Sequence, residues 1–144
     1  MNKKAEIFNK NLKELNLENL QKQEIDDQVH TVIFRSNLDI KKTLLPMAIF
    51  VDDTIYVNVR IQLIAKLLTD KKKEQKVTEY LNQLNEKYKI FKFYINANKE
   101  LLLDCCIPYL TVETFEPKLI RVIIEAAGQF LLTEYADVLK KIQA

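Results

Sequence analysis

The chain has 144 residues, of which 48% are hydrophobic and 29% charged, and its formal net charge at pH 7 is +2. This length and composition predict one folded domain over residues 1–144 with its own core, and exclude a largely disordered chain. The near-balance of charge argues against a nucleic-acid binder, which usually carries a basic excess. No segment approaches the ~20 apolar residues of a membrane span.

The cellular location is predicted from the N-terminus and the cysteines. Two early lysines are not followed by an apolar stretch, which argues against a secretory signal peptide. The two cysteines, Cys105 and Cys106, are adjacent, and on a strand they would point to opposite faces, which is poor geometry for a disulfide between them. Because Cys-x-x-Cys spacing and histidine-rich tracts are absent, we expect no metal or cofactor and a reducing, cytoplasmic location.

The first half of the chain predicts one helix followed by three strands. A short amphipathic helix is expected from Lys4 to about Leu15, because apolar residues recur there at three- and four-residue steps. The polar stretch "NLENLQKQEIDDQ" is expected to be a connection or an irregular edge strand. The strands are predicted by the β-branched and aromatic runs "VHTVIFRSNL", "LLPMAIFV" and "TIYVNVRI", whose short connections indicate an antiparallel meander.

The third run gives the clearest strand signal. In "TIYVNVRI" apolar and polar residues alternate, which predicts a sheet with one face in the core and one wetter face. We expect Ile55, Val57 and Val59 to share one face, opposite Tyr56 and Asn58. Pro46 in the second run cannot donate to a strand ladder, so we expect it at the start of its strand or at an exposed edge.

The second half predicts a helix, a hairpin and a long final helix. Thr69 or Asp70 is placed to cap a helix with a narrow apolar stripe that extends to Tyr88. The runs "KIFKFYI" and "ELLLDCCIPYL" flank "NANK" and predict a hairpin. Pro117 then opens the last helix. The fold class is therefore α+β, in the order α-β-β-β-α-β-β-α, with an antiparallel sheet packed by helices.

The apolar stripe of the last helix rotates by roughly a third of a turn along its length, at 3.6 residues per turn. Such a shift predicts two different packing partners, one of which could be another chain. Gly128, the only glycine of the protein, lies near the change and permits close backbone approach or a bend, at a cost of roughly 1 kcal/mol. The second half supplies the candidate partner or dimer surface: Leu131, Leu132, Tyr135, Val138 and Leu139.

Few residues suggest catalysis. Asp52 and Asp53 lie side by side, but aspartates between two strands commonly bond turn amides, so a hairpin turn is the favoured interpretation. His30 is the only histidine and lacks evident partners in the sequence. Leucines and an isoleucine flank Cys105, which predicts a buried structural thiol. With one glycine, the common phosphate-binding loops are excluded.

The order of elements and one long stretch resemble the YbjN-like proteins, which share the fold of type III secretion chaperones. The stretch is "YLNQLNEKYKIFKFYINANKELLLDCCIPY", and the matching positions are Leu81, Leu84, Asn85, Tyr88, Lys92, Phe93 and Ile95. The turn "NANK" differs, because such proteins commonly have a glycine there. The resemblance implies a compact α+β domain, often a homodimer, that binds other proteins and has no catalytic centre.

Three hypotheses for the function follow. The leading one is a non-enzymatic, cytoplasmic, homodimeric protein-interaction or chaperone-like module, whose contacts come from apolar sheet edges and the second half of the last helix. The alternative is a small-molecule-binding regulatory domain with a cavity between sheet and helix. A third is an enzyme centred on Asp52, Asp53 or His30.

Overall fold

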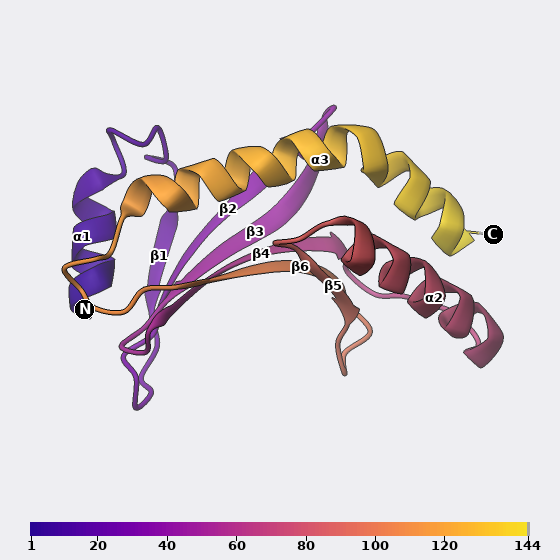
Figure 1. Ribbon diagram of the computed structural model, residues 1–144, viewed down its shortest axis with the longest axis horizontal. Helices are drawn as coiled ribbons and strands as arrows, with labels where there is room; N and C mark the ends of the chain where they lie inside the picture. Colours follow the sequence, from indigo (N-terminus) through magenta and orange to yellow (C-terminus); the bar gives the residue numbers. More distant parts are fainter. Residues whose placement is uncertain (144) are drawn as a thin grey trace.

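The alternating and amphipathic runs of the sequence form six strands and three helices (Figure 1). The computed structural model describes residues 1–143. In chain order the elements are α1 (Lys3–Asn11), β1 (Gln21–Glu24), β2 (Val32–Ile40), β3 (Thr43–Val51), β4 (Tyr56–Ile64), α2 (Lys71–Lys87), β5 (Lys92–Ile95), β6 (Leu101–Pro108) and α3 (Pro117–Gln143). The predicted α+β class and order are confirmed, and the polar stretch before β2 contributes the additional short strand β1.

All six strands belong to one antiparallel sheet with the order β1-β2-β3-β4-β6-β5. The first four strands form a meander, and β6 then pairs with β4, so that the β5–β6 hairpin completes the sheet. The sheet thus joins two parts of the chain that α2 separates.

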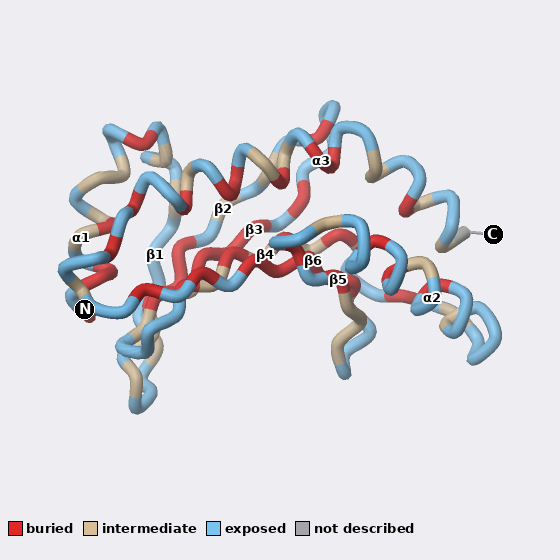
Figure 2. Tube along the Cα trace, viewed as in Figure 1, coloured by how far each residue is buried: buried red, intermediate tan, exposed pale blue. Residues whose placement is uncertain are grey.

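The helices cover only one face of this sheet (Figure 1). We call it the helix face; α1 and α3 lie on it, and the ring of Phe8 on α1 meets Phe34 on β2 edge to face at 4.8 Å. Figure 2 shows the buried positions along the central strands and on the side of α3 that faces them. The opposite face, here the open face, has no helix against it within the described residues.

Strand β4 confirms the alternation that the sequence predicts, with one exception. Val57 and Val59 are buried on the helix face, whereas Asn58 and Arg60 point to the open face. Ile55, however, precedes the strand and is 44% exposed, so the burial along this face begins only at Val57. The preceding residues form the turn, and β4 begins only at Tyr56.

The β2–β3 hairpin closes with the two-residue turn Lys41–Lys42. Both lysines have positive φ, 50° and 71°, as a type I′ turn requires. The residues that flank such a turn form a hydrogen-bonded pair, and hydrogen-bonded pairs alternate along the ladder. Pro46 therefore directs its nitrogen away from β2. Since the β3–β4 ladder begins at Met47, Pro46 lies at a local edge, inside the strand but without a partner there.

Helix α2 packs beside β5 at the far end of the sheet. Asp70 caps it by accepting a hydrogen bond from Lys73 N at 2.8 Å. From the exposed part of the helix next to β5, the Asn85 amide donates to Phe93 O at 3.0 Å and accepts from Phe93 N at 2.7 Å. Asn85 thereby occupies both backbone groups of Phe93 and closes this edge of the sheet.

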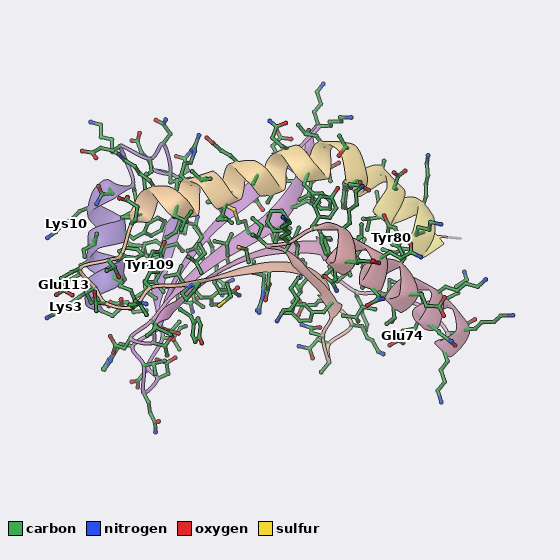
Figure 3. The ribbon with its side chains drawn as sticks, viewed as in Figure 1. Lys3, Lys10, Glu74, Tyr80, Tyr109 and Glu113 are labelled. Carbon is green, nitrogen blue, oxygen red and sulfur yellow. The ribbon has the colours of Figure 1, made fainter. Side chains whose placement is uncertain are left out.

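Helix α3 has two packing partners, as its rotated stripe predicts, but both belong to the same chain. Its first half lies on the sheet, where Ile120 and Ala127 are fully buried. Its second half passes α2, where Glu134 pairs with Lys87 at 2.7 Å and accepts from Tyr88 Oη at 3.0 Å. Tyr80 on α2 also faces this part of α3 (Figure 3).

Candidate interaction surface

Asp52 and Asp53 form the β3–β4 turn, as the sequence predicts. The Asp52 carboxylate accepts a hydrogen bond from Thr54 N at 2.9 Å, which is the bond of an Asx turn. The Asp53 carboxylate lies 2.6 Å from Nδ1 of His30, which has a positive φ of 51° and precedes β2. The structure therefore brings Asp53 and His30 together. With 71% of the His30 side chain exposed, the pair lacks the dry surroundings in which polar catalytic groups act most strongly.

The same turn is fastened to the N-terminal helix. Lys4 is buried, and its ammonium donates to the carbonyl oxygens of Thr54 and Tyr56. Burial lowers the pKa of Lys4, and the nearby charges of Asp52 and Asp53 partly oppose that change. The acidic pair thus has a structural role, because it supplies negative charge close to a buried cation.

The two cysteines are free and lie on opposite faces of β6. Cys105 is buried on the helix face, and burial raises the pKa of its thiol to about 11. Cys106 is exposed on the open face. A thiol with a raised pKa is a weak nucleophile at neutral pH, so the prediction of a buried structural cysteine is confirmed for Cys105.

A buried carboxylate anchors the middle of the open face. Asp104 accepts from Arg60 through two bonds of 3.0 Å, from Tyr94 Oη at 2.8 Å and from Asn58 Nδ2 at 3.2 Å. Its lone pairs are therefore occupied, and Arg60 is held flat against the sheet. This cluster stabilises the open face and leaves the charge of Arg60 neutralised.

The candidate surface on α3 is largely occupied within the chain. Leu131 and Val138 are fully buried, so both belong to the core rather than to an exposed surface. Tyr135 is half-buried and donates from its hydroxyl to Leu63 O at 3.1 Å, and Leu139 is half-buried as well. Of the five residues, Leu132 alone is classed as exposed, at 38%.

One sheet edge is only partly covered. Strand β1 pairs with Val32–Arg35 and leaves the rest of β2, Ser36–Ile40, without a paired strand on that side. We call Ser36–Ile40 the free β2 edge. By the alternation of the β2–β3 ladder, Asn37 and Asp39 direct their N–H and C=O groups to this side. Among residues 1–143, no backbone hydrogen bond reaches these groups from the segment before β1.

An apolar groove runs along the helix-face side of this edge. It has a volume of about 730 Å³ and lies between β2 and α3. Its apolar walls include Leu17, Leu20, Leu38, Ile40, Met47 and Leu132. Gly128 also lines it. At the rim, Arg121 and Glu125 form an ion pair of 2.8 Å, so the groove has no unbalanced charge from these two residues.

A polar hollow lies on the open-face side of the same edge. Its volume is about 750 Å³, and its lining includes Arg35, Asn37, Arg60, Gln62 and Glu100. The hollow and the apolar groove share Asn19, Ser36, Asn37 and Met47 in their linings. The free β2 edge therefore separates two cavities of opposite polarity.

The sequence contains little that would reveal this edge, since it depends on β1 being shorter than β2.

Comparisons with protein-family models, with curated proteins and with solved structures give no match. Among residues 1–143, no three or more His, Cys, Asp or Glu side chains are grouped so that they could hold a metal ion. None of the helices in the described part of the chain is long and apolar enough to span a bilayer.

Proposed function

We propose that the protein is a non-catalytic protein-interaction module that binds an extended segment of a partner protein along the free β2 edge. The observation that carries this proposal is that the outward backbone groups of Asn37 and Asp39 have no strand partner and lie between two cavities. Addition of a strand to a sheet edge is a common mode of peptide recognition, because the backbone bonds supply affinity and pockets for alternate side chains supply specificity.

The geometry favours a single strand over a second copy paired through the same edge. In a symmetric antiparallel pairing, Ile40 of the second copy would lie opposite Ser36, and its hairpin turn would reach Arg35. That place is already taken, because Gln21 of β1 pairs with Arg35. A separate extended segment has no hairpin to accommodate and would lie beside Asn19, which precedes β1 and lines both cavities.

The test uses the backbone N–H of Asn37, which points to the free edge. Asn37→Pro removes this donor but no bond of the β2–β3 ladder, and proline is tolerated at sheet edges. Asn37→Ala is the matched control, because it removes the same side chain and keeps the N–H. We expect proteins captured from a lysate of the native cells by the wild type and by Asn37→Ala to be lost with Asn37→Pro.

The test compares the amount of captured protein for the wild type, Asn37→Ala and Asn37→Pro, once their melting temperatures have been shown to be equal. Equal capture by Asn37→Pro and Asn37→Ala, or no specific capture by the wild type, would contradict binding at this edge.

The cytoplasmic location and the YbjN-like, chaperone-like kinship belong to the same proposal. They are supported by the order of the elements and by the free, unpaired state of both cysteines.

We also propose that the protein forms a homodimer through the outer side of α3. Leu119 and Val122 are exposed there by 38% and 54%, and residues three positions apart lie on one side of a helix. Sedimentation at tens of micromolar should give twice the chain mass of 17.0 kDa. Val122→Glu should give the single mass, and a wild type that sediments as a monomer would refute the dimer.

A second candidate function, small-molecule binding, is favoured by the size of the polar hollow, since ligand pockets commonly measure about 300–1,000 Å³. Arg35, Gln62 and Glu100 would contact a polar ligand there. A thermal-shift screen of metabolites tests it: a rise in melting temperature that Arg35→Gln abolishes supports a ligand site, and no rise for any compound counts against it.

A further inference from the structure

Gly128 has no role in the packing of the chain itself. It does not have a positive φ, and a Cβ built on it would meet no atom within 4 Å. Glycine in a helix interior costs roughly 1 kcal/mol relative to alanine. Neither backbone conformation nor close packing within the protein accounts for that cost. Because Gly128 lines the apolar groove, the space above it is open to a bound group.

We propose that the segment bound at the free β2 edge alternates apolar and acidic side chains, with a large apolar one over Gly128 and an acidic one beside Arg35. The proposal rests on the proposed function, because it assigns chemistry to the strand that binds there. Gly128 and Arg35 are then the residues that determine specificity.

The alternation follows from the pleat of the sheet. Directly opposite residues of neighbouring strands point to the same face, and successive residues point to opposite faces. A residue opposite Leu38 therefore directs its side chain into the apolar groove, toward Gly128. A residue opposite Asn37 directs its side chain into the polar hollow. Five residues of β2 are free, so the bound segment has about the same length.

The charge near the polar hollow favours an acid. Arg35 is exposed and forms no ion pair or side-chain hydrogen bond among residues 1–143, whereas Arg60 is held by Asp104. Glu100 also lines the hollow, where Gln62 and Asn96 donate to its carboxylate. Around the hollow and the hairpin tip, the three positive charges of Arg35, Lys41 and Lys42 therefore oppose the two negative charges of Glu100 and Asp39. A carboxylate that reaches Arg35 would gain a charge-assisted hydrogen bond, which is about twice as strong as a neutral one.

The test combines variants with fluorescein-labelled synthetic peptides of nine residues. In the first probe leucine alternates with glutamate, in the second lysine replaces glutamate, and in the third serine replaces leucine. Gly128→Leu fills the groove and removes the helical glycine, and Gly128→Ala removes the glycine but adds only a methyl group. Arg35→Gln removes the positive charge of the polar hollow that has no ion-pair partner among residues 1–143.

We expect the wild type to bind the leucine–glutamate probe at least about tenfold more tightly than either other probe, a difference of about 1.4 kcal/mol. Gly128→Leu should weaken this binding at least about tenfold although its melting temperature does not fall, while Gly128→Ala should bind within about threefold of the wild type. Arg35→Gln should remove most of the preference for glutamate over lysine.

Three results would overturn the proposal: no binding of the first probe to the wild type at millimolar concentration, equal binding of all probes, or unchanged binding by Gly128→Leu. These results are distinguishable from a failure of the proposed function. Loss of partner capture in Asn37→Pro would still support strand addition, with a segment of different chemistry. Probe binding that is the same in Asn37→Pro and Asn37→Ala would place the peptide away from the edge and refute both.

Discussion

At the scale of single residues, Lys41 and Lys42 hold a backbone conformation that suits them poorly. Both lie in the left-handed region, where a side chain with a Cβ costs roughly 1–2 kcal/mol and where asparagine and glycine are favoured. We expect the double variant Lys41→Asn with Lys42→Gly to raise the free energy of unfolding by about 1 kcal/mol in urea titrations.

The control for this variant replaces both lysines by glutamine, which removes the charges and keeps the Cβ atoms. It should leave the free energy of unfolding nearly unchanged. If the glutamine pair stabilises the protein as much as asparagine and glycine do, then charge repulsion rather than backbone conformation is responsible.

Cys105 makes the free energy of unfolding depend on pH in the alkaline range. Its thiol ionises near pH 9.0 in the unfolded chain and only at about 11 in the folded protein. Its contribution is therefore complete below pH 9 and is lost as the pH rises to 11, by about 2–3 kcal/mol. The raised pKa of Tyr109, about 12, acts in the same direction at higher pH, whereas the lowered pKa of Lys4 acts in the opposite direction.

The prediction is measured by urea titration at several pH values. Cys105→Ala should lose less stability between pH 9 and pH 11 than the wild type. Cys106→Ala, at the exposed neighbour, should change this slope less. Parallel pH profiles for the wild type and Cys105→Ala would show that the buried thiol has no such effect.

At the scale of elements, the edge of the sheet at β5 and the free β2 edge differ in how their backbone groups are protected. Asn85 occupies the backbone groups of Phe93 on β5, whereas no side chain of the described residues bonds the outward backbone groups of Asn37 on β2. Asn85→Ala should lower the free energy of unfolding by about 2 kcal/mol, because two hydrogen bonds to a strand are lost. Light scattering should also show association through the opened edge.

Asn82 offers a matched control on the same helix, since it is exposed and forms no side-chain hydrogen bond among residues 1–143. Asn82→Ala should change the free energy of unfolding by less than about 0.5 kcal/mol. Equal effects of the two substitutions would assign the loss to helix α2 itself rather than to the edge of β5.

The sequence predicts elements well where a pattern repeats and poorly where it does not. The alternation in "TIYVNVRI" is enough to predict β4 and its core face. All four residues of β1 are exposed and polar, so no pattern distinguishes this strand from a loop. Ile55 fits the alternation, yet the turn bonds of Asp52 and Thr54 delay the strand by one residue.

The candidate site could be predicted only in part for a related reason. The rotated stripe of α3 reveals a second packing partner but carries no sign of whether that partner is in the same chain. The second partner is α2, and Leu131 and Val138 are fully buried within the same chain. The free β2 edge depends on the relative lengths of two paired strands, and local patterns do not encode that relation.

At the scale of the whole molecule, the buried residues of the strands and of all three helices belong to one hydrophobic core. Strand β6 lies between β4 and β5, and α3 contacts both the sheet and α2. We therefore expect urea unfolding to be a single transition, with coincident curves from circular dichroism and tyrosine fluorescence. Separate midpoints for the two signals would indicate that α2 and the β5–β6 hairpin unfold independently of the meander.

The pairing of β4 with β6 also matters while the chain is being made. Translation at ~5–20 residues per second delivers β4 a few seconds before β6, because α2 and β5 lie between them. During that interval the β4 edge, with Val57, Val59 and Ile61, has no partner and is open to other nascent chains. The codons that encode residues 65–100 therefore set how long the risk lasts. Slower synonymous codons there should reduce the soluble yield of an unchanged protein.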